Sequence, residues 1–376
     1  MVDFAFSDEQ EQLRDAVRRF LEAKSPIAEV RRLMDGAEGY DPAVWSQMAN
    51  ELGLQSLAIP EEYGGQGFGY IELGIVFEEM GRSLLCAPYF STVALASNAV
   101  LVQGSDADKH AILPGIASGE TIATLAFTEP NGRWDAEGIT MQAAAAGDGV
   151  TLTGTKAFVV DGHLANTIIV VARDEATSGA DGIGFFVVDG EAPGLTRTQL
   201  ATMDQTRKLA RLEFANTPAV RMGDANAFDA FRKVLDLATT MLVNESVGGA
   251  QRVLEMSVDY AKERIQFGRP IGSFQAIKHK CADMLLEVES SKSAAYYAAA
   301  MAAEDSPELA VSASLAKAYV SDAYFHAAAE NIQIHGGIGF TWEHDAHLYF
   351  KRAKSNEVLL GDATYHRELV AQGIGL

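Results

Sequence analysis

Hydrophobic residues recur at helical spacing through the first part of the chain. Leu13, Val17 and Leu21 fall on one face of a helix that begins at Ser7, which forms a capping-box signature with Gln10. Four later segments continue the helical pattern: 45–52, 70–80, 90–102 and 107–117. The first third of the sequence therefore predicts a set of helices.

The pattern changes near Thr121 to short runs rich in β-branched and aromatic residues. Gly, Asp, Asn and Pro separate these runs, which is typical of β-strands joined by turns. The runs cover residues 121–127, 150–160, 167–172, 183–188 and 210–214. Together they predict a compact β domain of about 100 residues, a usual size for one domain.

Helical spacing returns after Phe228 and holds up to the Gly-Arg-Pro break at 268–270. A second helix is predicted over residues 273–303. Ser306, followed by a proline and an acid, then indicates the start of a third helix, which ends near the glycine pair 336–337. The last part of the chain is therefore expected to form a helical bundle.

The expected fold class is mainly α with a central β domain. We place an N-terminal helical domain at residues 1–120, a middle β domain at 121–225 and a C-terminal helical bundle at 226–376.

Composition excludes several functional classes. A chain of 376 residues with 48% hydrophobic content can bury a large core. Its formal net charge of −21 opposes binding to nucleic acid or to an anionic membrane surface, because both require a positive surface. The longest apolar runs, such as 168–172, are far shorter than the roughly 20 residues that a membrane span requires.

The chain shows no pattern of a metal site. Cys86 and Cys281 lack CxxC or Cys/His partners, which argues against bound metal and against disulfides. For His335, His344, His347 and His366 we expect a polar or cofactor-proximal role, because no third type of ligand occurs at metal spacing. The N-terminus has no basic segment followed by an apolar one, so we expect no signal peptide and a location in the reducing cytoplasm.

Six short motifs follow one another along the chain. They are Pro60-Glu-Glu-Tyr-Gly-Gly65, Glu78-Glu-Met-Gly81, Thr128-Glu-Pro130, Thr153-Gly-Thr-Lys156, Arg264-x-x-Phe-Gly268 with Gln275, and Gln333-x-x-Gly-Gly337. In this order they resemble the acyl-CoA dehydrogenase family over essentially the whole chain. The resemblance implies a C-terminal four-helix bundle, FAD as cofactor, an acyl-CoA substrate and an electron-transfer flavoprotein as electron acceptor.

In that family each flavin also contacts a neighbouring subunit. The residues here that match the neighbour's contribution, which we call the flavin arm, are Arg264, Phe267, Gln275, Gln333, Gly336 and Gly337. Thr128 matches a residue that contacts the subunit's own flavin. An arginine offers a charged fork to a pyrophosphate, and paired glycines let the backbone approach a nucleotide closely.

The resemblance also exposes a conflict over catalysis. Family members remove the α-proton of the thioester with a glutamate while the β-hydrogen leaves as hydride to the flavin. The two positions where the family carries this glutamate fall on Leu360 and Ala238 here. Neither residue can accept a proton.

Further departures fall in the part of the site that a subunit builds for its own flavin. Arg133 and Trp134 replace small residues after the Thr-Glu-Pro motif. Phe158 stands where a tryptophan is common, and Val160 stands where a threonine often meets the flavin. Residues offered to a neighbour are therefore kept, whereas those of the chain's own pocket are altered.

Three interpretations follow. The first is a partner subunit in a heteromeric assembly, such as a heterotetramer, with a glutamate-bearing homologue. The second is a self-sufficient homo-oligomeric enzyme that uses a displaced acid, for which the candidates are Glu357, Asp362 and Glu245. Glu245 lies about 10 Å beyond Ala238 along one helix. The third is a flavin-free structural or binding homologue.

Overall fold

A computed structural model describes residues 6–147 and 149–376, which divide into two compact units. The helical unit comprises the chain up to Arg32 together with Gly69–Leu85 and Thr239–Leu376. The sheet unit comprises Leu33–Phe68 and Cys86–Ala238. The predicted fold class, mainly α with a central β domain, is confirmed.

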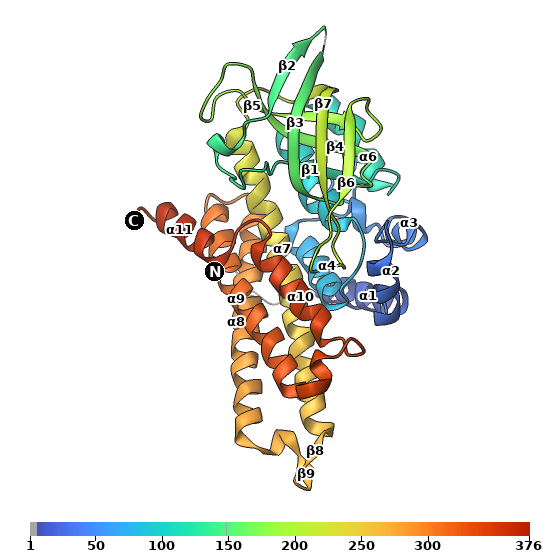
Figure 1. Ribbon diagram of the computed structural model, residues 1–376, viewed down its shortest axis with the longest axis vertical. Coiled ribbons are helices and arrows are strands. Elements are labelled where there is room, and N and C mark those ends of the chain that lie inside the picture. The colour runs from blue at the N-terminus through green and yellow to red at the C-terminus, as the bar shows by residue number, and fades with distance from the viewer. Residues whose placement is uncertain (1–5, 148) are drawn as a thin grey trace. The chain divides into compact units, whose positions relative to one another are not determined.

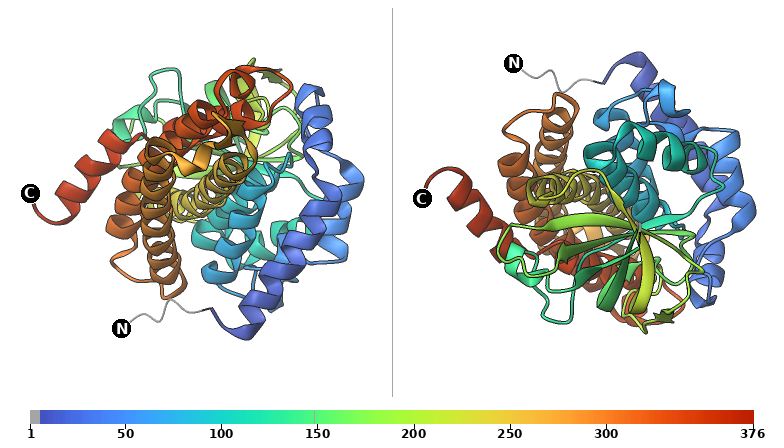
Figure 2. Two further views of the ribbon diagram at one scale, coloured as in Figure 1. Left: turned by 90° about the horizontal axis from the view of Figure 1, so that it is seen from below. Right: turned by 90° about the horizontal axis from the view of Figure 1, so that it is seen from above.

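The helical unit consists of long helices joined by short connections. Its elements are α1 (Asp8–Lys24), most of α2 (Ile27–Asp35), α4 (Tyr70–Arg82), the later part of α7 (Phe228–Glu263), β8 (Ile265–Gln266), β9 (Arg269–Pro270), η5 (Ile271–Ser273), α8 (Gln275–Ala303), α9 (Leu309–His335), η6 (Gly336–Phe340), α10 (Ala346–Val358) and α11 (Ala363–Gly373). Helix α9 packs against α8, α10 and α11, and Figures 1 and 2 show α8 and α9 side by side.

Local sequence signals explain several helix ends. The capping box at Ser7 is present. The Ser7 hydroxyl accepts a hydrogen bond from the backbone N–H of Gln10, and the Gln10 side chain accepts one from the backbone N–H of Ser7. Helix α9 begins at Leu309, three residues after the predicted N-cap at Ser306. The Ser306 hydroxyl instead accepts a hydrogen bond from the Glu308 backbone at 3.2 Å, so this signal forms a turn before the helix.

Two glycines allow α4 and α7 to pack in close contact. A Cβ atom added at Gly81 would lie 1.8 Å from the carbonyl oxygen of Glu245. One added at Gly248 would lie 1.7 Å from the carbonyl oxygen of Glu78. The two backbones therefore touch where both helices lack side chains.

Replacing Gly248 by alanine should destabilise the helical unit, because α4 and α7 must separate to admit the new methyl group. We expect a loss of about 3 kcal/mol, at the upper end of the usual range for overpacked cores. Thermal unfolding followed by circular dichroism measures this loss. The matched control is Gly337→Ala, where an added Cβ meets no atom within 4 Å and the unfolding temperature should stay unchanged. Unfolding of Gly248→Ala at the wild-type temperature would contradict the close packing.

The sheet unit combines short helices with seven strands. Its helical elements are α3 (Pro42–Asn50), η1 (Leu54–Ser56), η2 (Glu61–Tyr63), η3 (Phe90–Ser97), α5 (Asn98–Gln103), α6 (Asp106–Ala117) and η4 (Ala136–Gly138). Its strands are β1 (Ala123–Ala126), β2 (Gln142–Ala146), β3 (Gly149–Val160), β4 (Thr167–Asp174), β5 (Ile183–Asp189), β6 (Leu195–Gln199) and β7 (Leu209–Met222).

Five of these strands close into a ring. They pair in the order β4, β2, β3, β7 and β5, and β5 pairs again with β4, while β1 joins β4 and β6 joins β7 (Figure 1). Closure satisfies the backbone groups that an open edge would leave unpaired. Ile168, Val170, Phe186 and Leu212 belong to the buried core of this ring.

No helix among residues 6–147 and 149–376 is long and apolar enough to cross a membrane.

Candidate functional site

The turn between β8 and β9 displays an aromatic ring. Phe267 and Gly268 occupy its two central positions with φ values of 53° and 77°, which is typical of a type I′ hairpin. A bulky residue at positive φ is strained, and such strain is common at functional sites. The Phe267 side chain is 91% exposed and meets Phe274 edge-on, with ring centroids 6.1 Å apart. The hairpin therefore holds a ring that the single chain barely covers.

Two polar residues of the flavin arm flank this hairpin. Arg264 directly precedes β8, and its carbonyl oxygen accepts a hydrogen bond from the backbone of Ile271 at 2.8 Å. Gln275 is the first residue of α8. Both side chains are exposed, and no carboxylate of the described chain forms an ion pair with Arg264. The guanidinium charge of Arg264 is thus available to an anionic ligand.

The other half of the arm lies at the end of α9. Gly336 has φ 65° and ψ −138°, a conformation that is close to exclusive to glycine. A Cβ atom added at Gly336 or at Gly337 would meet no heavy atom within 4 Å. Gln333, one turn earlier, is exposed. The glycine pair therefore lines open space, as the close approach of a nucleotide or a second subunit would require.

Both halves of the arm lie at the same end of the helical unit. Figure 1 shows the β8–β9 hairpin at the end of α7 and the start of α8. Tyr260 in the last turn of α7 stacks on His335 at the end of α9, with ring centroids 4.3 Å apart. Segments far apart in the sequence are thus assembled into one exposed group of residues.

The two positions assigned to the catalytic glutamate are apolar and buried. Leu360 is 3% exposed in the helical unit, and Ala238 is fully buried in the sheet unit. Leu360 also has φ 61°, in the left-handed region that a leucine rarely adopts. Neither position offers a proton acceptor.

The three candidate replacement acids all have structural partners. Glu245 accepts hydrogen bonds from Arg352 at 2.7 Å and from Asn356 at 3.2 Å, and all three residues are buried. Glu357 forms an ion pair with Lys354 at 2.8 Å. Their contacts are those of structural ion pairs.

The third acid caps a helix. Asp362 precedes α11, and its carboxylate accepts a hydrogen bond from the backbone of Tyr365 at 2.8 Å. This contact accounts for an acid at position 362 without any catalytic role.

A buried lysine and a buried histidine hold the backbone around Leu360. Lys317 on α9 donates to the carbonyl oxygens of Gly361 at 2.7 Å and Glu357 at 3.0 Å. His366 on α11 donates from Nε2 to the carbonyl oxygen of Leu360 at 2.9 Å. These bonds, donated from two helices, hold the strained segment in place. They explain how Leu360 keeps a positive φ.

Burial shifts the pKa of both groups downward. Desolvation lowers the pKa of Lys317 to about 7, although Glu357 and Asp362 oppose the shift. Desolvation and the nearby Lys317 lower the pKa of His366 to about 4. His366 is therefore neutral at physiological pH and donates a single hydrogen bond to this segment.

The shift at His366 predicts a loss of stability in acid. Below pH 6.5 the unfolded chain binds a proton that the folded chain does not bind until about pH 4. Stability should therefore fall as the pH decreases through this window, by about 3 kcal/mol for this group alone. Urea unfolding between pH 7 and pH 4 measures the loss. In His366→Gln, which keeps a donor but cannot titrate, that part of the pH dependence should vanish; an unchanged slope would contradict the assignment.

Thr128 is already engaged by one of the unusual residues of its own loop. The indole Nε1 of Trp134 donates to the Thr128 hydroxyl at 2.9 Å, and Thr128 is buried. Arg133 forms ion pairs with two acids of the same segment, Asp135 and Glu137. The hydroxyl that the resemblance assigns to the chain's own flavin thus has an internal donor.

Strand β3 carries a bulge close in sequence to the same motifs. Its pairing with β7 shifts between Lys156 and Val159, and Phe158 lies there with φ 54° and 58% of its side chain exposed. Lys156 is buried in an ion pair with Glu129 at 2.8 Å. Val160 is buried and has no polar side-chain atom. An aromatic ring is still presented at this bulge, whereas the hydroxyl expected at 160 is lost.

Comparison with known proteins connects these features. Family models match three parts of the chain: the N-terminal domain of acyl-CoA dehydrogenases at residues 7–120, the middle domain at 124–217 and the C-terminal domain at 228–375. The chain belongs to the acyl-CoA dehydrogenase family. It is accordingly an oxidoreductase-family protein with the three domains of that family.

Individual relatives place the chain within this family. A protein named acyl-CoA dehydrogenase IpdE2 from Mycolicibacterium smegmatis is 33% identical over 355 residues, which cover 94% of this chain and 95% of that protein. The fold matches the crystal structure of the ChsE4–ChsE5 complex from Mycobacterium tuberculosis with a TM-score of 0.89 and 29% identity, covering 99% of each chain. It also matches the Tcur3481–Tcur3483 steroid ACAD, with a TM-score of 0.88, 29% identity and 98% of each chain covered.

For an acyl-CoA dehydrogenase family member, the flavin arm fits the cofactor. It combines an unpaired arginine, an exposed aromatic ring and a glycine pair that faces open space. Sequence reasoning gave Tyr260 and Lys317 no role and expected only a polar or cofactor-proximal role for His366, whereas the structure places all three in contact with the arm or the Leu360 segment. These residues belong to no motif, and their partners lie 6 to 75 positions away along the chain.

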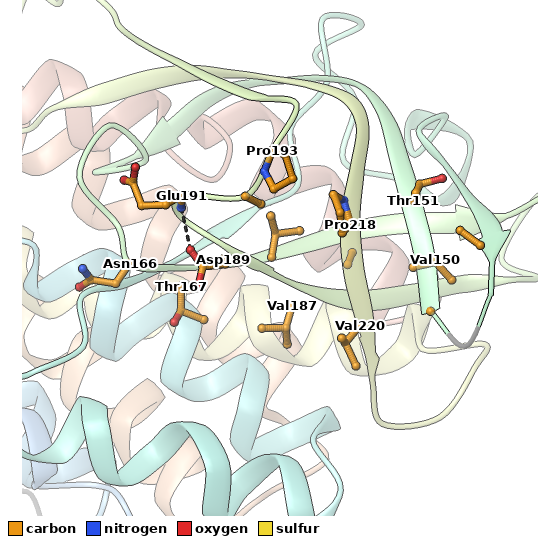
Figure 3. A pocket seen from close by; sticks show the side chains of 15 residues that line it. Val150, Thr151, Asn166, Thr167, Val187, Asp189, Glu191, Pro193, Pro218 and Val220 are labelled. Atoms are coloured by element: carbon orange, nitrogen blue, oxygen red, sulfur yellow. Dashed lines mark hydrogen bonds between the residues drawn. The ribbon is translucent and has the colours of Figure 1, made fainter.

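A separate groove of about 950 Å³ lies on the sheet unit (Figure 3). Its lining is mostly valine, alanine and proline, and Asp189 and Glu191 are the titratable side chains among its described residues. The Asp189 carboxylate accepts a hydrogen bond from the Glu191 backbone at 2.7 Å. In the described residues no group of His, Cys, Asp and Glu has the arrangement of a metal site. The groove therefore lacks an acid–base or metal constellation.

Proposed function

We propose that this chain is the partner subunit of a heteromeric acyl-CoA dehydrogenase and lends its flavin arm to a homologue that carries the catalytic glutamate. The observation that carries the proposal is the burial of apolar residues at both base positions, Leu360 and Ala238. The arm residues, by contrast, are exposed and presented by strained or glycine-specific backbone. The chain thus keeps the residues that a subunit offers to its neighbour's flavin but lacks the family's base at both of its known positions.

The arm's chemistry suits a shared flavin. FAD held by these residues would supply the acceptor for the hydride that leaves the β-carbon of the acyl-CoA thioester. Arg264 would hold a phosphate charge through its planar fork, and Gly336 and Gly337 would admit the nucleotide close to the backbone. Phe267 would offer an apolar ring, while Gln275 and Gln333 would donate hydrogen bonds. Removal of the α-proton requires a carboxylate, which the homologue would provide.

The relatives support a mixed assembly. ChsE4–ChsE5 and Tcur3481–Tcur3483 are each assemblies of two differently named chains, and each matches nearly the whole of this chain. We extend to this protein the substrate class named for the second assembly, a steroid-derived acyl-CoA thioester. An electron-transfer flavoprotein would reoxidise the flavin, as in other members of the family.

The contacts of the three acids disfavour a self-sufficient enzyme. A base must accept a proton in the closed site, yet Glu245 is held by Arg352, Glu357 by Lys354, and Asp362 by a helix N-terminus. Freeing Glu245 would leave a buried arginine without its carboxylate, which costs about 3 to 5 kcal/mol. These acids are better explained as structural groups.

Reconstitution tests the proposal. The chain is produced alone and together with a glutamate-bearing homologue from the same genome, and the purified proteins are assayed for dehydrogenation of steroid-derived and fatty acyl-CoA thioesters. We expect a mixed oligomer with turnover and no turnover from this chain alone. Turnover by a homo-oligomer of this chain would overturn the proposal in favour of a displaced base. A colourless protein in both preparations would support the flavin-free interpretation.

A further inference from the structure

Three aromatic side chains, which we call the stack, form a continuous row of ring contacts beside the glycine pair of the flavin arm. Tyr260 from α7 stacks on His335 from α9, with ring centroids 4.3 Å apart and planes inclined by 27°. His344, just before α10, contacts His335 as well, with ring centroids 4.3 Å apart and planes tilted by 48°. His335 directly precedes Gly336. The stack therefore ties the ends of three helices to the segment that carries the glycine pair.

Hydrogen bonds show which ring nitrogen donates and which accepts in the two imidazoles. His335 donates from Nδ1 to the carbonyl oxygen of Asn331 at 2.8 Å. His344 accepts at Nδ1 from the backbone N–H of Ala346 at 3.1 Å, which requires an unprotonated Nδ1. Asn331 is held in turn by Ser257 of α7, whose hydroxyl donates to it at 2.9 Å. The observed geometry is that of a neutral His344, in a frame that its neighbours fix.

The charges around the stack oppose a proton on either ring. Arg31 on α2 donates to the carbonyl oxygen of His344 at 3.2 Å and forms an ion pair with Asp345 at 2.9 Å, so the nearest carboxylate is already paired. Burial and the neighbouring His344 lower the pKa of His335, and the hydrogen bond to Asn331 partly offsets this. Burial and Arg31 lower the pKa of His344, and Asp345 only partly offsets this.

A second cluster, formed by Trp342, His347 and Lys351, adjoins the stack. Trp342 stacks on His347 with ring centroids 4.7 Å apart, and the Lys351 ammonium lies 4.7 Å from the same indole. Burial, Lys351 and Arg31 lower the pKa of His347 as well. Glu343 is exposed in the connecting loop. On balance the elements packed around the stack present cations rather than free carboxylates.

We propose that Tyr260, His335 and His344 are positioning residues of the flavin arm, and that their stack orders residues 333–337 for a neighbour's FAD only while His344 is neutral. The inference rests on the proposed function, since it concerns how the arm is held. Protonation of His344 would place a second cation near Arg31, and it would remove the acceptor that His344 offers to Ala346. The rings would separate, and the glycine pair would lose its fixed position.

The sign of the pH dependence follows from the lowered pKa values. A disordered arm has histidines that titrate near 6.5, whereas the stacked arm resists protonation, so acid favours disorder. FAD affinity should therefore be constant above about pH 7. It should fall by about tenfold for each pH unit below 6.5, until the pKa of His344 in the stacked form is reached.

The test measures FAD affinity of the mixed oligomer by flavin fluorescence between pH 5.5 and pH 8. We expect the wild-type assembly to bind FAD about tenfold more weakly at pH 5.5 than at pH 7.5. His344→Phe keeps a ring and should bind with no such pH dependence, whereas Tyr260→Leu should bind more weakly at every pH. The control His326→Gln, an exposed histidine of α9 paired with Glu287, should match the wild type.

A second measurement is independent of the flavin. Proton NMR of the chain alone follows the histidine ring protons, with His344 identified by its loss in His344→Phe. A pKa of His344 below 6.5 is expected, and titration at the ordinary value would overturn the inference. A wild-type pH slope in His344→Phe would also overturn it. If no assembly binds FAD at any pH, the proposed function fails and the positioning role fails with it, while the NMR titration still reports whether the stack is neutral.

Discussion

Replacing Arg264 by alanine should weaken FAD binding by the mixed oligomer about tenfold to a hundredfold. The Arg264 guanidinium has no carboxylate partner in the described chain, so its charge is available to a phosphate of the cofactor. A hydrogen bond that involves a charged group contributes about 1.5 to 3 kcal/mol, which corresponds to this change in affinity. Flavin fluorescence during dilution of the purified assembly measures the dissociation constant.

The matched control is Arg367→Ala. Arg367 is an exposed arginine of the same helical unit that forms an ion pair with Asp322. It should leave FAD affinity unchanged, because exposed pairs contribute little and it lies outside the arm. Equal loss of flavin in both variants would indicate a general effect of charge, and full retention in Arg264→Ala would contradict the arm assignment.

Replacing the homologue's catalytic glutamate by glutamine should reduce turnover of the assembly by about 10²- to 10⁴-fold, the usual contribution of a general base. Amide substitutions in this chain should change turnover by less than about twofold, since the structure gives its acids structural partners. The informative variants are Glu357→Gln and Asp362→Asn. Asparagine keeps the helix cap at 362, and glutamine at 357 removes the partly exposed pair with Lys354. Each substitution also removes one of the negative charges near Lys317. Steady-state kinetics on the co-purified assemblies provides the comparison.

A large fall in kcat for either variant, with circular dichroism and flavin content unchanged, would place a catalytic acid on this chain. Glu245 is less suitable for this test. Its buried pair with Arg352 would be broken by the substitution, and a loss of folding would be confused with a loss of catalysis.

Local sequence signals predicted most of the helices and strands. Helix α7 and strand β4 follow from sustained spacing of apolar and β-branched residues. Strand β2 was missed because its sequence, Gln142–Ala146, is four alanines after a glutamine and has no β-branched residue. The segment predicted as one helix over 90–102 begins as a π-helix, η3, and continues as α5, since spacing of apolar residues does not distinguish these hydrogen-bond patterns.

The flavin arm could be located from sequence, but its presentation could not. The Arg-x-x-Phe-Gly motif indicates a turn. Local preferences argue against a positive φ at a phenylalanine, however, so the conformation of Phe267 could not be predicted. Similarly, the sequence showed that a leucine occupies position 360, where the family carries its base. It could not show that the left-handed backbone of Leu360 depends on hydrogen bonds from Lys317 and His366. At the Leu360 segment, hydrogen bonds from other helices, including one from Lys317, which lies 44 residues from Gly361, override local propensity.

The candidate acids show the same limit of local signals. Spacing along α7 placed Glu245 on the face of Ala238, but about 10 Å along the axis, which is too far for a simple exchange of the base. The partner that explains it, Arg352, lies 107 residues further along the chain. Motif order therefore established the family, whereas the distinction between a base and a structural carboxylate required the fold.

The most direct test of the central claim is the amount of FAD bound per chain, measured by absorbance after denaturation. We expect no stoichiometric flavin on the chain purified alone and one FAD for every two chains in the assembly with a glutamate-bearing homologue. One FAD per chain on a homo-oligomer of this protein would contradict it.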